Sequence, residues 1–269
     1  MKKNVSVLSI AYFTFILLII LSAGLDGIVS DAMYYLAFIL PIFAVILFTD
    51  REAPKMCEFS LTEKAEKILF PTVFPAITLI AAISIATTLL ISLFGGAPAK
   101  TDVGSDLITA LCYYALLPSI LEEMLFRYLP MRYIAPYSKR YAVLFSAVFF
   151  SLAHHSFFSI PYALFAGALF MTVDLLCESC LPSMMLHFVN NAVSVLWMMY
   201  FGETFSVSVL FAVLLVPCAV SLFVIFKRRR LYLDGLSEIF SDKGERVSPL
   251  PMIFAAFISI LAAVLETLG

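Results

Sequence analysis

Apolar runs of about 17 to 25 residues recur along the whole chain, and they constrain its fold more than any other feature. A helix needs about 20 apolar residues to cross the hydrocarbon of a bilayer. We interpret nine runs as spanning helices, at about residues 5–24, 33–49, 70–94, 106–126, 141–157, 159–177, 181–200, 205–226 and 251–268. The sequence therefore predicts an all-α fold, a polytopic transmembrane helical bundle of about eight to nine membrane helices.

Composition supports a membrane location. Of 269 residues, 62% are hydrophobic and only 13% are charged, whereas about a quarter of a soluble domain is charged. The lipid bilayer is therefore the expected partner for much of the surface. No basic tract is interleaved with aromatic residues, so we expect no nucleic-acid partner.

The basic residues predict an orientation. If the N-terminus is cytoplasmic and all nine runs span, 15 of the 17 Lys and Arg residues fall on the cytoplasmic side, Lys100 falls outside, and Arg127 lies within a helix. Cytoplasmic loops carry such an excess of positive charge. The first run follows Lys2-Lys3 and lacks a clean cleavage site, so we interpret it as an uncleaved helix. We expect an integral protein of the plasma membrane with a cytoplasmic N-terminus.

Few ionisable groups lie in the apolar runs, and most of them are grouped. The groups are Glu122, Glu123 and Arg127 in the fourth run, His154 and His155 at the end of the fifth, Asp174 and Glu178 in the sixth, and His187, followed by Asn190 and Asn191, in the seventh. Buried ionisable groups cost several kcal/mol in a membrane unless they are paired or hydrated. Each group is therefore a candidate for function.

Helical spacing separates the two glutamates. Glu123 and Arg127 are four residues apart with the acid first, the favourable order for an ion pair. Glu122 is rotated by about 100° from Glu123 and has no local partner. We therefore predict that Glu122 acts as a general base on water, and that Glu123 and Arg127 form a supporting ion pair.

Two further helices supply polar groups. His187 and Asn191 share one helix face, and both can donate hydrogen bonds to the oxyanion of a tetrahedral intermediate. His154 could orient the attacking water, with Phe150 packed against its ring one turn earlier. The adjacent His155 is the alternative to His154. Asp174 could line an access cavity or cap a neighbouring helix.

Three motifs together resemble a known family. Glu-Glu-x-x-x-Arg (122–127), Phe-x-x-x-His (150–154) and His-x-x-x-Asn (187–191) occur in this order. They are similar to motifs of the type II CAAX prenyl protease family, also called CPBP intramembrane proteases, which includes abortive-infection-type membrane proteins. The resemblance covers about residues 106–200.

The resemblance implies a catalytic membrane core at 106–200, with N-terminal membrane helices at 1–105. C-terminal membrane helices would follow at 201–269, with a cytoplasmic loop at 227–250 that could hold one short amphipathic helix. It also implies peptide-bond hydrolysis by a glutamate-activated water. A cofactor is left open: either none is present, or zinc is held by Glu122, His154 and His187.

The resulting hypothesis is an intramembrane endopeptidase that acts on a membrane-associated peptide or protein. A proton- or ion-coupled transporter is the main alternative, because intramembrane acids and histidines also build proton relays. A catalytically silent membrane scaffold is a third. The substrate stays open between a prenylated C-terminus, which is the substrate class of the eukaryotic family members, a short secreted peptide and a membrane protein.

Overall fold

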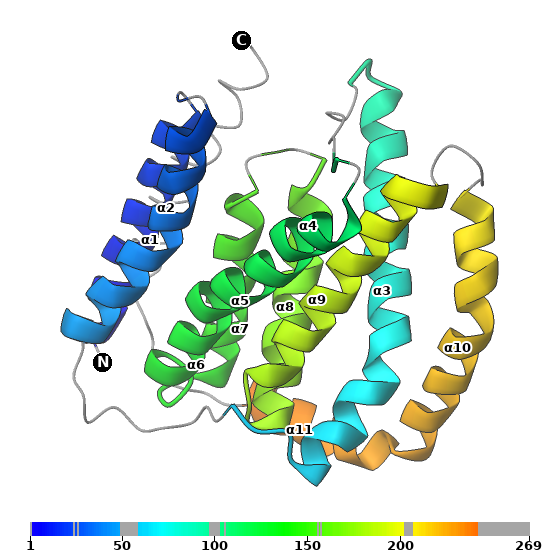
Figure 1. The fold of residues 1–269 in the computed structure, drawn as a ribbon. Coiled ribbons are helices and arrows are strands. Elements are labelled where there is room, and N and C mark those ends of the chain that lie inside the picture. The colour runs from blue at the N-terminus through cyan, green and yellow to red at the C-terminus, as the bar shows by residue number, and fades with distance from the viewer. Residues whose placement is uncertain are drawn as a thin grey trace.

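The computed structural model describes residues 2–23, 25, 27–48, 59–96, 103–104, 106–154, 156, 158–201 and 207–241. The elements in these ranges are helices, as the all-α prediction requires. α1 (Lys2–Ala23) and α2 (Gly27–Phe48) form an antiparallel pair on one side of the bundle. α3 (Glu63–Ser92) and α10 (Val207–Lys227) lie together on the other side (Figure 1).

The centre of the bundle is built from α7 (Lys139–Leu152), α8 (Ile160–Cys177) and α9 (Leu181–Leu196), which continues into η3 (Trp197–Phe201). α7 and α8 approach closely at Gly167, where an added Cβ would lie 2.8 Å from the Cα of Ala147. Small residues allow such backbone contact between membrane helices.

One long helix, residues 107–133, crosses the bundle obliquely (Figure 1). It consists of α4 (Leu107–Leu111), η1 (Cys112–Leu116), α5 (Leu117–Glu123), η2 (Met124–Tyr128) and α6 (Leu129–Tyr133). The two η segments are π-helical, and each ends two residues before a proline, Pro118 or Pro130. Proline removes a backbone donor and its ring crowds the preceding turn, so the wider π turn relieves the crowding without breaking the helix.

α1 is anchored to this oblique helix by a buried tyrosine. The Tyr12 hydroxyl donates a hydrogen bond to the carbonyl of Leu125. Its ring stacks on Phe126 and Phe149, with centroids 5.5 and 4.7 Å away. The first predicted membrane segment therefore packs directly behind the turn that follows the two glutamates.

The described residues contain five helices that are long and apolar enough to span a membrane, at residues 63–92, 107–133, 160–177, 181–201 and 208–227, and two shorter apolar helices at 6–22 and 32–48. The predicted segment at 141–157 is the 14-residue α7, and the predicted segment at 251–268 lies outside the described residues. A total of eight to nine membrane helices thus remains a prediction. Many large apolar side chains on the outside of α3 and α10 are exposed, as expected where lipid is the solvent.

The loop predicted at 227–250 does contain a short helix, α11 (Arg229–Ser241), at the end of the bundle where α3 begins and α10 ends (Figure 1). The rest of that loop, 242–250, is outside the described residues.

Candidate active site

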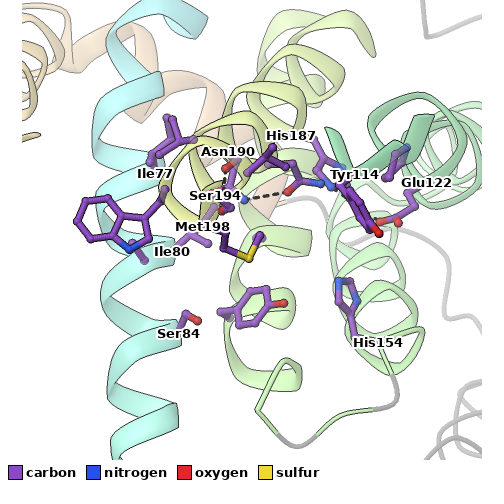
Figure 2. Close-up of a pocket in the computed structure, with 18 of the residues that line it drawn as sticks. Ile77, Ile80, Ser84, Tyr114, Glu122, His154, His187, Asn190, Ser194 and Met198 are labelled. Carbon is purple, nitrogen blue, oxygen red and sulfur yellow. Dashed lines mark hydrogen bonds and ion pairs between the residues drawn. The ribbon is translucent and has the colours of Figure 1, made fainter. Parts of the chain in front are cut away.

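A cavity of about 680 Å³ lies in the centre of the bundle and contains the predicted site. Glu122, His154, His187 and Asn191 all line it. Figure 2 shows Glu122 and His154 on one side of the cavity and Ile77, Ile80 and Ser84 of α3 on the other. Three separate helices thus bring the predicted catalytic residues to one space, which has a polar side and an apolar side.

His187 lies between the two glutamates. Its Nδ1 is 2.7 Å from Oε1 of Glu123, and its Nε2 is 3.9 Å from Oε2 of Glu122. A carboxylate only accepts hydrogen bonds, so Nδ1 of His187 carries a proton and donates a hydrogen bond to Glu123. Nε2 is thereby directed toward Glu122 and the cavity. The contact of His187 with Glu123 was not predicted, because it depends on the packing of α9 against α5.

The predicted ion pair between Glu123 and Arg127 is confirmed. Oε1 of Glu123 is 3.0 Å from Nη1 of Arg127, and both side chains are fully buried. The guanidinium also lies 3.9 Å above the ring of Phe150 and 5.3 Å from that of Phe170. Cation–π contacts of this kind become stronger when they are desolvated. One oxygen of Glu123 therefore contacts both the buried arginine and the histidine that faces the cavity.

His154 follows α7 directly and lines the cavity. Its Nδ1 is 2.9 Å from the carbonyl oxygen of Phe150, and its ring is in edge contact with the ring of Phe150 at 4.8 Å. The predicted packing of Phe150 against His154 is confirmed. Because a carbonyl only accepts, Nδ1 donates, and the tautomer is fixed by the backbone of the preceding turn. The alternative residue, His155, lies outside the described residues.

Asn191 also lines the cavity, one turn beyond His187 on α9. Its Oδ1 accepts a hydrogen bond of 3.2 Å from Nδ2 of Asn190 (Figure 2). Asn190 is itself a lining residue, a position that was not predicted. Oδ1 of Asn191 accepts this hydrogen bond, so Nδ2 is the atom of Asn191 that can donate a hydrogen bond to a substrate in the cavity.

Asp174 caps α9, one of the two roles that its sequence position suggested. Its Oδ1 accepts a hydrogen bond of 2.9 Å from the backbone N–H of Ser183, in the first turn of α9. The residue before α9, Cys180, makes no side-chain capping bond. A carboxylate there satisfies a backbone donor and interacts favourably with the helix dipole. Asp174 is fully buried and thus fixes the start of the helix that carries His187.

Glu178 plays a different part. It ends α8 in a left-handed conformation, with φ of 56°, and its carboxylate pairs with Lys64 at 2.8 Å on the surface. The repulsion expected between two acids one turn apart is avoided because Glu178 leaves the helix there.

Replacing Asp174 by leucine should therefore destabilise the protein, whereas asparagine should not. Leucine leaves the Ser183 N–H without an acceptor in the interior, and losing a helix cap costs about 1–2 kcal/mol. Asparagine keeps an acceptor oxygen in the same place. Thermal unfolding of the purified variants in detergent measures the difference. Equal melting temperatures for the two variants would contradict the capping role.

The three side chains that the sequence suggested as zinc ligands, Glu122, His154 and His187, do not come together in the structure. Among the described residues, no group of three His, Cys, Asp or Glu side chains is placed to hold a metal ion. Glu122 and His187 approach each other, but His154 does not complete a ligand set with them. The predicted residues thus do not fit a zinc site, and the description as a metalloprotease has no support in this geometry.

Tyrosines are the lining residues that the sequence reasoning missed. Tyr34 and Tyr35 of α2, Tyr113 and Tyr114 of η1, and Tyr162 of α8 all line the cavity. Tyr34 and Tyr162 thus share the cavity with the Glu122 carboxylate. The two Tyr-Tyr pairs inside apolar runs were a signal that could have identified them, because a buried tyrosine hydroxyl usually needs a polar partner.

One comparison with known families matches the part of the chain that contains this site. Residues 104–193 match the family model described as type II CAAX prenyl endopeptidase Rce1-like. Searches of curated proteins and of solved structures gave no match. The matched residues contain Glu122, Glu123, Arg127, His154, His187 and Asn191. Residues 104–193 of this integral membrane protein, about a third of its length, thus carry a domain of the Rce1-like type II CAAX prenyl endopeptidase family, a family of hydrolases.

Proposed function

We propose that the protein is an intramembrane endopeptidase that hydrolyses a peptide bond of a membrane-associated protein or peptide, with a water molecule activated by Glu122. One observation carries the proposal. Glu122 lies at the polar side of a large cavity, 3.9 Å from a histidine that Glu123 holds from behind. The separation of 3.9 Å is too long for a direct hydrogen bond but can be bridged by water.

In this mechanism Glu122 removes a proton from the water, and the resulting hydroxide attacks the carbonyl carbon of the scissile bond. The carbonyl oxygen becomes an oxyanion. His187, donating from Nε2 in its imidazolium form, and the amide of Asn191 stabilise it. Glu122 then returns the proton to the departing nitrogen as the C–N bond breaks. The water has supplied OH to one product and H to the other.

His154 positions the water in this scheme. Its Nδ1 is engaged by the Phe150 carbonyl, so the other ring nitrogen is the one that can contact water in the cavity. Glu123 and Arg127 hold His187 rather than touch the substrate. The fixed ring orientation matters because catalytic donors are effective only when they already point to the developing charge.

The apolar side of the cavity supports a membrane-associated substrate. Ile77 and Ile80 of α3 lie across the cavity from Glu122 (Figure 2), and Ile85, Met198 and Leu210 also line it. An extended peptide next to Glu122 would place apolar side chains against this surface. Either a lipid chain or the aliphatic side chains of a substrate would fit this apolar surface. We propose the plasma membrane as the location, with the N-terminus in the cytoplasm, and the asymmetry of the basic residues supports this orientation.

The test compares cells that express the wild-type chain with cells that express the Glu122→Gln chain. Protein termini in the membrane fractions are identified by mass spectrometry, after growth of parallel cultures in water enriched in ¹⁸O. We expect a set of new termini only with the wild-type chain, and ¹⁸O from water in each new carboxyl group. The same termini in both cultures would contradict the proposal.

A further inference from the structure

A second hollow, far along the bundle from the active site, is lined almost entirely by cations. It lies at the end of the bundle where α3 begins and α10 passes into α11 (Figure 1). Its volume is about 430 Å³. The residues that line it are Lys67, Lys227, Arg228, Arg229, Arg230 and Leu231. Five of these residues are basic, and we call the space that they line the basic hollow.

The charges of the basic hollow are largely uncompensated. Lys67 pairs with Glu63 one turn earlier on α3. Within the described residues, none of the four cations at 227–230 forms an ion pair with a carboxylate. The nearest acid on α11, Asp234, lines a separate hollow with Lys64 and Lys139. Four exposed like charges in sequence repel one another, so an anion bound among them would be strongly favoured.

The hollow has a defined shape because two helices are tied together there. Nη1 of Arg228 donates a hydrogen bond of 2.8 Å to the backbone carbonyl of Lys67, which fixes the turn between α10 and α11 against α3. Arg229 and Lys227 lie over the rings of Phe226 and Phe223, at 5.0 and 5.4 Å. The cations are therefore held on a folded surface rather than on a loose tail.

The position of the hollow relative to the bilayer identifies the anion. The apolar span 208–227 ends at Lys227, and Phe223 and Phe226 are exposed on its outer face, as lipid-facing rings would be. The hydrocarbon region thus ends about where the cations begin. Phosphate groups of lipids lie at this level, and basic pockets beside membrane helices bind anionic headgroups.

We propose that the basic hollow binds the phosphodiester headgroup of an anionic membrane lipid. Arginine suits this ligand because its planar guanidinium can donate two hydrogen bonds to one phosphate. Binding would hold together the ends of α3 and α10. α3 also supplies the apolar side of the active-site cavity through Ile77 and Ile80.

The test measures lipid binding to the purified full-length protein by native mass spectrometry. Phosphatidylglycerol and phosphatidylcholine with the same acyl chains are titrated separately. We expect phosphatidylglycerol to bind at least about tenfold more tightly, since each basic residue at a membrane surface contributes to anionic-lipid affinity. The triple variant Arg228→Gln, Arg229→Gln, Arg230→Gln should lose this preference. The double variant Arg229→Gln, Arg230→Gln keeps the Arg228 contact with Lys67, and it should lose the preference while remaining folded.

A matched control removes the same number of charges from the same end of the bundle, outside the hollow. This variant carries Lys64→Gln, Lys139→Gln and Arg140→Gln, and we expect it to keep the preference. An equal loss in the control would overturn the proposal in favour of diffuse attraction. Equal binding of the two lipids by the wild-type protein would also overturn it, as would saturation by millimolar inorganic phosphate without any binding of phosphatidylglycerol.

Discussion

Arg127→Met is expected to be the most destabilising single substitution in this protein. Arg127 has no exposed surface, and its guanidinium is stabilised by the Glu123 carboxylate and by the faces of Phe150 and Phe170. Methionine would leave the Glu123 charge buried with its only arginine partner gone. Breaking a buried pair in this way costs about 3–5 kcal/mol, a large part of the total stability of a typical protein. The expected result is little monodisperse protein after purification in detergent.

A double substitution separates the charge from the packing. In Glu123→Met, Arg127→Met both charges are removed and the volume is largely filled, and such replacements are often neutral in stability. We expect the double variant to recover most of the folded protein that Arg127→Met loses, as measured by size-exclusion yield and melting temperature. It should not recover activity, because His187 Nδ1 loses its acceptor. A double variant less stable than Arg127→Met would show that the pair is not the source of the effect.

Glu122→Gln should have the opposite profile, with folding retained and hydrolysis lost. The side chain faces the cavity, and its closest ion pair among the described residues is the one with His187 at 3.9 Å, so an amide of the same shape should fit. An amide cannot take a proton from water, and the loss of a general base typically reduces the rate by about 10²–10⁴-fold. The measurement is the rate of product formation by the purified variant, with a substrate identified from the termini that differ between the two cultures.

Glu66→Gln provides the control for this experiment. Glu66 is exposed on the first turns of α3 and does not line the cavity, so its replacement removes the same charge without touching the site. We expect wild-type rates for this variant. The mechanism would be wrong if Glu122→Gln retained most of the wild-type rate while its melting temperature stayed unchanged.

Several contacts of the site could be predicted from the sequence, because residues one turn apart on the same helix lie next to each other. The Glu123–Arg127 pair, the packing of Phe150 on His154 and the orientation of Glu122 away from Glu123 all follow from positions one turn apart or adjacent on one helix. The family resemblance over the core was also found from motifs that each lie within two helical turns.

Spacing could not predict contacts between helices. The sequence suggested that Glu122, His154 and His187 act together, but spacing within each helix gives no distance between residues on different helices. The long helix 107–133 crosses the bundle obliquely and is widened by π turns before Pro118 and Pro130 (Figure 1). The three side chains therefore line one cavity, although a set of parallel straight helices would not have predicted it.

The sequence by itself determined that the chain is an all-α membrane protein. It also determined which polar residues lie in the apolar helices, because hydrophobicity and helical periodicity are local properties of the sequence. The tertiary structure alone decided what those residues contact. It placed His187 between Glu122 and Glu123, made Asp174 the cap of α9, and brought no three metal-ligating side chains together among the described residues. These are contacts between residues 9 to 65 positions apart, and only helix packing fixes them.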